Sequence, residues 1–178
     1  MSKLTNVELT MPRTIKNIIL HCADTSNDES FTVHDIDDWH RQRGWGRLPQ
    51  WREQFNPDLT SIGYHFVIYL DGSVHTGRHV DEVGAHCAGV NSESIGICMI
   101  GRDKFKQVQW DALEELLDNL KMTYPAAQIK GHYQFPSAVA QGKAPCVMAE
   151  AAIALAIAAV PEGLPIVATL TLARGMWR

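Results

Sequence analysis

Short apolar runs alternate with helical patterns along most of this 178-residue chain, and this alternation constrains the fold more than any other feature. Residues 15–21 and 94–100 have the apolar content of buried strands, and residues 128–130 suit a shorter one. Two helical patterns lie among these runs. Strands interleaved with helices predict an α/β fold, with a mixed central β-sheet flanked by helices.

Two helices are predicted from their capping residues and apolar faces. Thr32 is the expected N-cap of a helix that ends near Arg43, with Asp35 placed for a capping box and Gly44 placed to stop the helix. Residues 107–124 form the clearest helical pattern, because apolar side chains recur on one face: Trp110, Leu113, Leu116, Leu117 and Leu120.

Turn residues divide the region between these helices. The dipeptide Asp71-Gly72 predicts a hairpin between strands at residues 64–70 and 73–77. Residues 45–61 carry Gly, Pro and Asn, so we expect a long surface loop of the kind that often carries function on a rigid scaffold.

The charge, the N-terminus and the cysteines narrow the class of protein. With 16 Lys and Arg against 20 Asp and Glu, the net charge of −4 argues against nucleic-acid binding through bulk positive charge. The first residues lack the apolar core of a secretory signal, so we expect a protein that is cytoplasmic as synthesised. We also expect a monomer. Four cysteines without CxxC spacing favour free thiols over a disulfide framework: Cys22, Cys87, Cys98 and Cys146.

The composition changes abruptly at residue 147. Hydrophobic residues make up 22 of the last 32 positions, against 60 of the first 146. We therefore divide the chain into a flexible lead-in (1–13), a domain (14–146) and an atypical apolar C-terminal segment (147–178).

Histidine and cysteine residues supply a candidate metal site. His21 ends the first predicted strand, His132 follows the short strand at residues 128–130, and Cys146 lies beyond it, preceded by Lys143. Two imidazoles and a thiolate would give zinc three protein ligands and leave a fourth position for water, as in catalytic sites. The spacing alone leaves a simple hydrogen-bonded role open for either histidine.

Five motifs in sequence extend this interpretation. The chain contains, in this order, IILHCADT, WHRQRGW, GYHFVIYLDGSVHTGR, GAHCAGVNSESIGICMIG and KGHYQFP. The series resembles the zinc-dependent N-acetylmuramoyl-L-alanine amidases, which include phage lysozyme-like amidases and the animal peptidoglycan recognition proteins. The resemblance spans residues 15–143. It implies the amidase fold, a Zn²⁺ cofactor, and hydrolysis of the amide between N-acetylmuramic acid and L-alanine in peptidoglycan, as in an endolysin that reaches the cell wall after its release.

The resemblance also assigns roles to single residues. It implies that His21 and His132 are zinc ligands, that Cys146 is the third, and that Tyr64 and Lys143 assist at the oxyanion. These residue types suit that chemistry, because a phenol and an ammonium can donate hydrogen bonds to a developing negative charge. A half-buried aromatic of purely structural role remains the alternative for Tyr64.

Other residues of the motifs receive secondary roles. Ala85, His86 and Asn91 lie in the segment that lines the substrate groove in the family. His65 alternates with Tyr64 along a strand and should face the other way, so we expect it to be structural. The remaining histidines, including His40, are expected to be solvated.

The chain departs from the family pattern near its third ligand. The family usually has Lys-x-Cys-Pro, whereas residues 143–146 read Lys-Ala-Pro-Cys. A shift by one residue moves a Cα by up to about 3.8 Å, while zinc–sulfur bonds are held near about 2.3 Å. Cys146 can bind zinc only if its loop rearranges. The rival hypothesis is therefore a peptidoglycan-binding module without catalysis.

The last segment has a different resemblance. Residues 147–178 are similar to the fourth transmembrane segment of P-type cation-transporting ATPases, through the run Pro-Glu-Gly-Leu-Pro at 161–165. The chain lacks the phosphorylation sequence of those pumps, so pumping is excluded. Residues 151–173 have the length and apolar content to span or associate with a membrane, although the prolines would break a helix. We expect a fusion segment, with membrane tethering as a third hypothesis.

Overall fold

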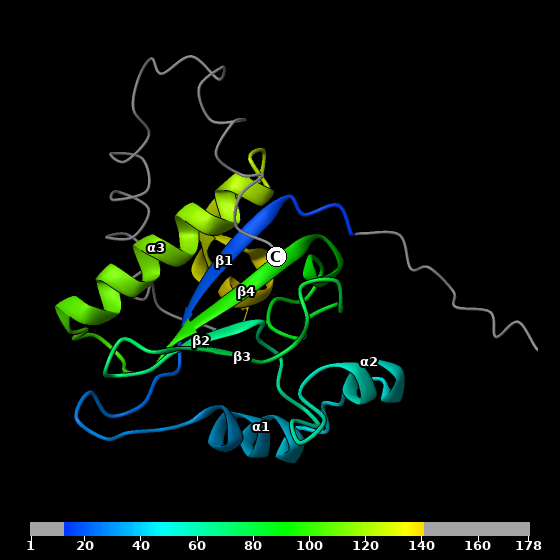
Figure 1. Cartoon of the computed structure of the whole chain (residues 1–178), viewed down its shortest axis with the longest axis horizontal. Helices are drawn as coiled ribbons and strands as arrows, with labels where there is room; N and C mark the ends of the chain where they lie inside the picture. Colours follow the sequence, from blue (N-terminus) through cyan, green and yellow to red (C-terminus); the bar gives the residue numbers. More distant parts are fainter. Residues whose placement is uncertain (1–12, 141–178) are drawn as a thin grey trace, which may run out of the picture.

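A computed structural model of the chain describes residues 13–140, in which five strands form one mixed sheet in the order β3-β2-β4-β1-β5 (Figure 1). The strands are β1 (Asn17–Cys22), β2 (Phe66–Ile68), β3 (Val74–Thr76), β4 (Ser94–Met99) and β5 (Gln128–Gly131). β1 pairs in parallel with β4 and β5, β2 pairs in parallel with β4, and β2 pairs antiparallel with β3. This arrangement confirms the predicted α/β class with a mixed central sheet.

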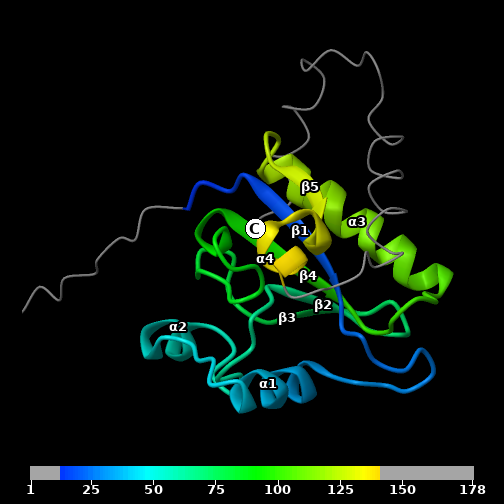
Figure 2. The ribbon, with the colours of Figure 1, turned by 180° about the vertical axis from the view of Figure 1, so that it is seen from behind.

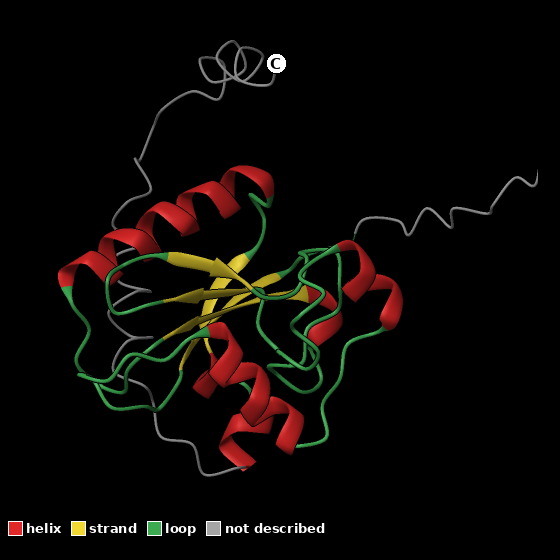
Figure 3. Cartoon of the chain, turned by 60° about the horizontal axis from the view of Figure 1, so that its bottom comes forward, coloured by secondary structure: helices red, strands yellow, loops and turns green. Residues whose placement is uncertain are grey.

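Helices cover the two faces of this sheet unequally. The long helix α3 (Gln107–Thr123) lies along one face, and α1 (Val33–Gln42) and α2 (Pro49–Gln54) lie on the other side (Figure 3). Seen from behind, the short helix α4 (Pro136–Ala140) follows β5 beside β1 (Figure 2). The sheet is therefore a layer between helices, and its two faces carry different side chains because strand residues alternate.

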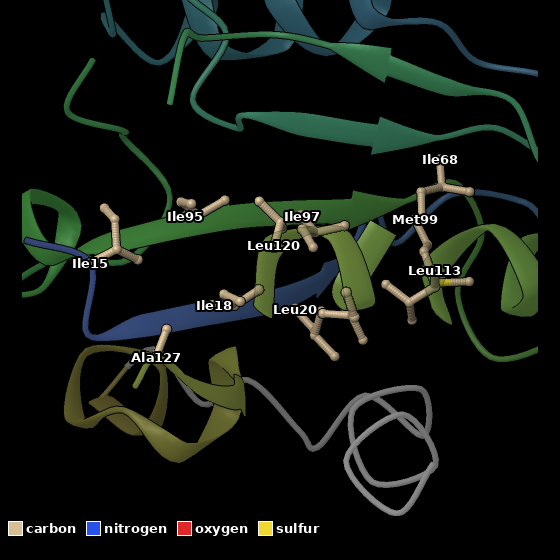
Figure 4. Close-up of a cluster of buried hydrophobic side chains, with 11 residues drawn as sticks. Ile15, Ile18, Leu20, Ile68, Ile95, Ile97, Met99, Leu113, Leu120 and Ala127 are labelled. Atoms are coloured by element: carbon tan, nitrogen blue, oxygen red, sulfur yellow. The ribbon is translucent and has the colours of Figure 1, made fainter. Parts of the chain in front are cut away.

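The face under α3 is an apolar core, at whose end the buried Gln109 of α3 donates a hydrogen bond to the Ile100 carbonyl oxygen. Ile18 and Leu20 of β1 and Ile97 of β4 meet Leu113 and Leu120 of α3 in one cluster, with none of these five side chains more than 7% exposed (Figure 4). Full burial of such a side chain contributes about 1.5–3 kcal/mol. The apolar face predicted for residues 107–124 is thus confirmed, and this face of the sheet is covered mainly by apolar packing.

Local signals fix the ends of α1. Thr32 accepts a hydrogen bond from the Asp35 amide, and the Asp35 carboxylate accepts one from the Thr32 amide, so the predicted capping box is present. Gly44 follows the helix with a φ of +75°, a conformation in which glycine carries no Cβ penalty.

The predicted long surface loop at residues 45–61 is wrong in part. The segment contains α2, which begins at Pro49, and it is anchored by Arg47. The Arg47 side chain is 0% exposed, and its guanidinium pairs with the Glu82 carboxylate at 2.8 Å. Arg47 also donates to the carbonyl oxygens of Phe55 and Leu59. Arg47 thus holds the segment in place through a buried ion pair and through hydrogen bonds from its remaining N–H groups to the backbone. The turn-forming residues of the segment do not predict such a contact.

The borders of the predicted domain need one correction. Arg13, expected in the flexible lead-in, donates hydrogen bonds to the carbonyl oxygens of Val80 and Asn91 at 3.0 Å, so it belongs to the folded domain. The rest of the predicted lead-in and the apolar segment 147–178 lie outside the described residues. Within residues 13–140, no helix is long and apolar enough to cross a membrane.

Candidate active site

The parallel pairing of β1 with β5 brings His21 and His132 together. Leu20 is in register with Gly131, so the next residue of each chain segment lies at the same carboxyl edge of the sheet and on the face opposite α3. The two imidazole rings are 4.5 Å apart between centroids, and His21 is 4% exposed. Two residues far apart in sequence thus form an imidazole pair, of which His21 is buried and His132 partly buried, at the edge where parallel sheets present functional groups.

Tyr64 lies over the same face, just before β2. Its ring is 5.0 Å from that of His21, and the side chain packs against the buried cluster that contains Cys98. Burial, and next the neighbouring thiols of Cys98 and Cys22, raises the pKa of Tyr64 well above its usual value. The phenol therefore keeps its proton at neutral pH and remains a hydrogen-bond donor.

His86 completes this group of rings. Its Nδ1 lies 3.1 Å from Nε2 of His21, and its ring lies over Gly96, where a Cβ would come within 2.6 Å of the imidazole. Burial is the main cause that holds the pKa of His86 well below its usual value, and the neighbouring His65 and His132 act in the same direction. His86 is thus a neutral imidazole in contact with His21.

The other two residues predicted to line the groove support the backbone around this group. Asn91 accepts hydrogen bonds at its amide oxygen from the backbone amides of His86 and Cys87, at 2.9 and 2.8 Å. Ala85 donates its amide to the Gly63 carbonyl oxygen, which joins the segment of His86 to that of Tyr64. Both residues therefore lie next to the group, where their described contacts hold its loops.

His40 corrects a prediction. It was expected to be solvated, yet it is 3% exposed and its Nδ1 accepts a hydrogen bond from the Gly63 amide at 2.9 Å. Asp37, one turn earlier on α1, accepts from the amides of Ser61 and Ile62. The spacing of these two residues with Ile36 on the buried helix face was the signal that could have identified them.

His65 lies in the same layer but has a different role. Its Nδ1 accepts from the Gly96 amide and its Nε2 lies 3.0 Å from the Glu82 carbonyl oxygen, so a neutral ring satisfies both partners. Burial lowers the pKa of His65 to about 3. These contacts agree with the structural role expected for this residue.

Donor chemistry decides what the imidazole pair can hold. Zinc accepts imidazole ligands in their neutral form. His21 at the end of β1 and His132 directly after β5 are therefore suitable as a pair of zinc ligands. Within residues 13–140, no group of three His, Cys, Asp or Glu side chains forms a complete metal site. The predicted third ligand Cys146 and the predicted oxyanion residue Lys143 lie outside these residues.

Comparisons with known proteins show which family has a sequence similar to this chain. The family model described as N-acetylmuramoyl-L-alanine amidase matches residues 11–146. An endolysin of Enterobacteria phage K11 is 32% identical over 138 residues, which cover 73% of this chain and 82% of the endolysin.

Solved structures show the same architecture. The N-acetylmuramoyl-L-alanine amidase LysC from Clostridium intestinale superposes with a TM-score of 0.57 at 30% identity, over 68% of this chain and 72% of LysC. Drosophila PGRP-LB, at 22% identity, shares the fold with a TM-score of 0.54 over 89% of this chain and 88% of its own.

Proposed function

Because the chain belongs to the N-acetylmuramoyl-L-alanine amidase family and hydrolyses the amide between N-acetylmuramic acid and L-alanine in peptidoglycan, we propose that zinc bound by His21, His132 and Cys146 forms its catalytic centre. The observation that carries this proposal is the contact between the imidazole rings of His21 and His132, with the protonated Tyr64 beside His21. Cys146 enters by resemblance, since it lies beyond the described residues.

The bound zinc would polarise the scissile carbonyl and supply a water of lowered pKa. The chain's own residues complete the chemistry. The centroid of the Tyr64 ring lies 5.0 Å from that of His21, and the phenol keeps its proton. The hydroxyl can therefore donate a hydrogen bond to the carbonyl oxygen of the substrate as negative charge develops there. Lys143 is proposed as a second donor.

Zinc content and hydrolysis, measured on the same preparation, test the proposal. We expect about one zinc per chain, release of stem peptides from purified peptidoglycan, and loss of that release when a chelator removes the metal. His21→Ala should abolish both zinc binding and hydrolysis. The matched control is His34→Ala, which removes an exposed imidazole from α1 and should change neither. Full hydrolysis by His21→Ala would show that the metal assignment is wrong.

The shifted Cys146 needs a test of its own. If its sulfur is the third ligand, Cys146→Ser should lower zinc affinity and hydrolysis together, because a hydroxyl is a poorer zinc ligand than a thiolate. If the variant retains both, another group completes the centre. A wild-type protein that binds muropeptide, but neither binds zinc nor hydrolyses peptidoglycan, would favour the rival hypothesis of a binding module.

The substrate also defines where the protein acts. We propose that it works on the cell wall after its synthesis, with peptidoglycan as its partner. Residues 147–178, which resemble a transmembrane segment of cation pumps, lie beyond the matched residues 11–146 and outside the described part of the chain. We propose that this segment is a fusion that adds no step to hydrolysis.

A further inference from the structure

We propose that His86 is a positioning residue, which fixes the orientation and the tautomer of His21 through a one-directional chain of hydrogen bonds. The inference deepens the proposed function and rests on it, because His21 is the residue proposed to bind zinc. It replaces the role in the substrate groove that the family resemblance suggested for His86.

The first step is that His86 is held too firmly to serve as an adaptable groove contact. The side chain is 7% exposed. Its ring lies against two glycines: a Cβ at Gly84 would lie 2.5 Å from the ring, and one at Gly96 would lie 2.6 Å from it. Real side chains do not approach so closely, so both positions must lack a Cβ for the ring to lie on the sheet. Asn91 fixes the backbone of the same residue.

The second step is the direction of each hydrogen bond. The Ser94 hydroxyl has one proton and donates it to the Val90 carbonyl oxygen at 2.8 Å. Ser94 can therefore only accept from Nε2 of His86, at 3.4 Å. A neutral imidazole that is protonated at Nε2 carries a lone pair at Nδ1. That atom lies 3.1 Å from Nε2 of His21, so His21 is the donor.

The third step is the consequence for His21. An imidazole that donates from Nε2 carries its lone pair at Nδ1, and Nδ1 is then the nitrogen that this chain of hydrogen bonds assigns to the metal. Histidine ligands commonly donate their other N–H to an acceptor that sets their tautomer, and loss of that acceptor typically costs about 10- to 100-fold in metal affinity or activity. In this protein the acceptor is a second imidazole, whose own proton is held by Ser94.

Two variants of similar size separate positioning from packing. His86→Asn places an amide oxygen near the position of Nδ1, whereas His86→Leu has the same branching without an acceptor. The first readout is the ¹⁵N spectrum of the imidazoles in the full chain without metal. We expect His21 to be protonated at Nε2 in the wild type and in His86→Asn, and to become a mixture of tautomers in His86→Leu.

The second readout is zinc affinity, measured by competition with a chelator. We expect His86→Leu to bind zinc about 10- to 100-fold more weakly than the wild type, and His86→Asn to recover most of that loss. Circular dichroism and thermal unfolding without metal should show that both variants fold. His34→Ala, an exposed histidine, should behave as the wild type.

The outcomes are distinguishable. Protonation of His21 at Nδ1 in the wild type, or equal zinc affinities for the folded Asn and Leu variants, would overturn the positioning role. A wild type that holds His21 protonated at Nε2 but binds no zinc would contradict the proposed metal centre and leave the hydrogen-bond chain standing.

Discussion

At the scale of single residues, Tyr64 shows how burial prepares a donor. Because its pKa is raised, the folded protein holds the phenolic proton more tightly than the unfolded chain does. The donor is therefore present throughout the neutral and moderately alkaline range. Ionisation of this phenol should not limit hydrolysis below about pH 10, the ordinary value for tyrosine.

Tyr64→Phe removes the hydroxyl and leaves the ring that contacts His21. We expect kcat for stem-peptide release to fall by about 10²- to 10³-fold, the usual cost of one oxyanion donor. Zinc content and thermal stability should stay close to the wild type. Hydrolysis at the wild-type rate would mean that Tyr64 has only the structural role of a half-buried aromatic.

His65 should make stability depend on pH. Its pKa is about 3 in the folded protein and near 6.5 when unfolded, so the unfolded state binds the extra proton first. The free energy of unfolding should therefore fall as the pH drops below 6.5, by up to about 1.4 kcal/mol per pH unit from this one group.

Urea unfolding at several pH values between 7 and 4 tests this, with His65→Gln for comparison. The variant lacks the titrating ring, so its free energy of unfolding should fall less on acidification than that of the wild type. Parallel pH profiles for the two proteins would contradict the buried, neutral assignment.

At the scale of elements, α1 acts as a clamp on the segment that carries Tyr64. Asp37 and His40 accept hydrogen bonds from three consecutive backbone amides, those of Ser61, Ile62 and Gly63. Burial alone would raise the pKa of Asp37, but the hydrogen bonds from the Ser61 and Ile62 amides and from Thr60 outweigh it and lower the pKa. The carboxylate thus stabilises the fold above the unfolded pKa, and this contribution is lost in acid.

Asp37→Ala should destabilise the domain by about 2–4 kcal/mol, because two buried amides lose a charged acceptor. Asp37→Asn keeps one acceptor oxygen and should cost clearly less. Urea unfolding near pH 7 compares the two variants with the wild type. At a pH below the usual aspartate range, the difference between wild type and Asp37→Asn should shrink. Equal losses for Ala and Asn would show that packing, and not the acceptor, sets the cost.

The sequence predicts those features of these elements that depend on local interactions, but not those that depend on contacts between distant segments. The start of α1 follows from Thr32 and Asp35, and the apolar face of α3 from its period, because both signals lie within one helix. The course of residues 45–61 depends on the ion pair of Arg47 with Glu82. Helix α4, which begins at Pro136, has only five residues, too few to show a periodic pattern. Contacts between distant segments leave no periodic pattern.

At the scale of the whole molecule, the sheet order decides the site. The sequence places His21 and His132 each at the end of a strand, but it does not say that β1 and β5 are neighbours, which the pairing of Leu20 with Gly131 establishes. His40 lies on the buried face of α1 with Ile36, so its burial could have been inferred from the helical spacing. The family motifs supplied the chemistry that spacing alone left open.

Removal of residues 147–178 should leave hydrolysis within about twofold of the full chain, because the family match ends at residue 146. Stem-peptide release per bound zinc is the measurement. Detergent partitioning of both forms tests the membrane hypothesis at the same time: partitioning that disappears with the segment would support tethering. A large loss of hydrolysis would show that the segment contributes to the domain.

The pairing of β1 with β5 also determines when, during translation, the imidazole pair can form. β1 is the first strand of residues 13–140 to leave the ribosome and β5 is the last, and the imidazole pair forms only when the two lie side by side. A nascent chain that ends before β5 has His21 without its partner. We therefore expect products terminated before β5 to be inactive toward peptidoglycan.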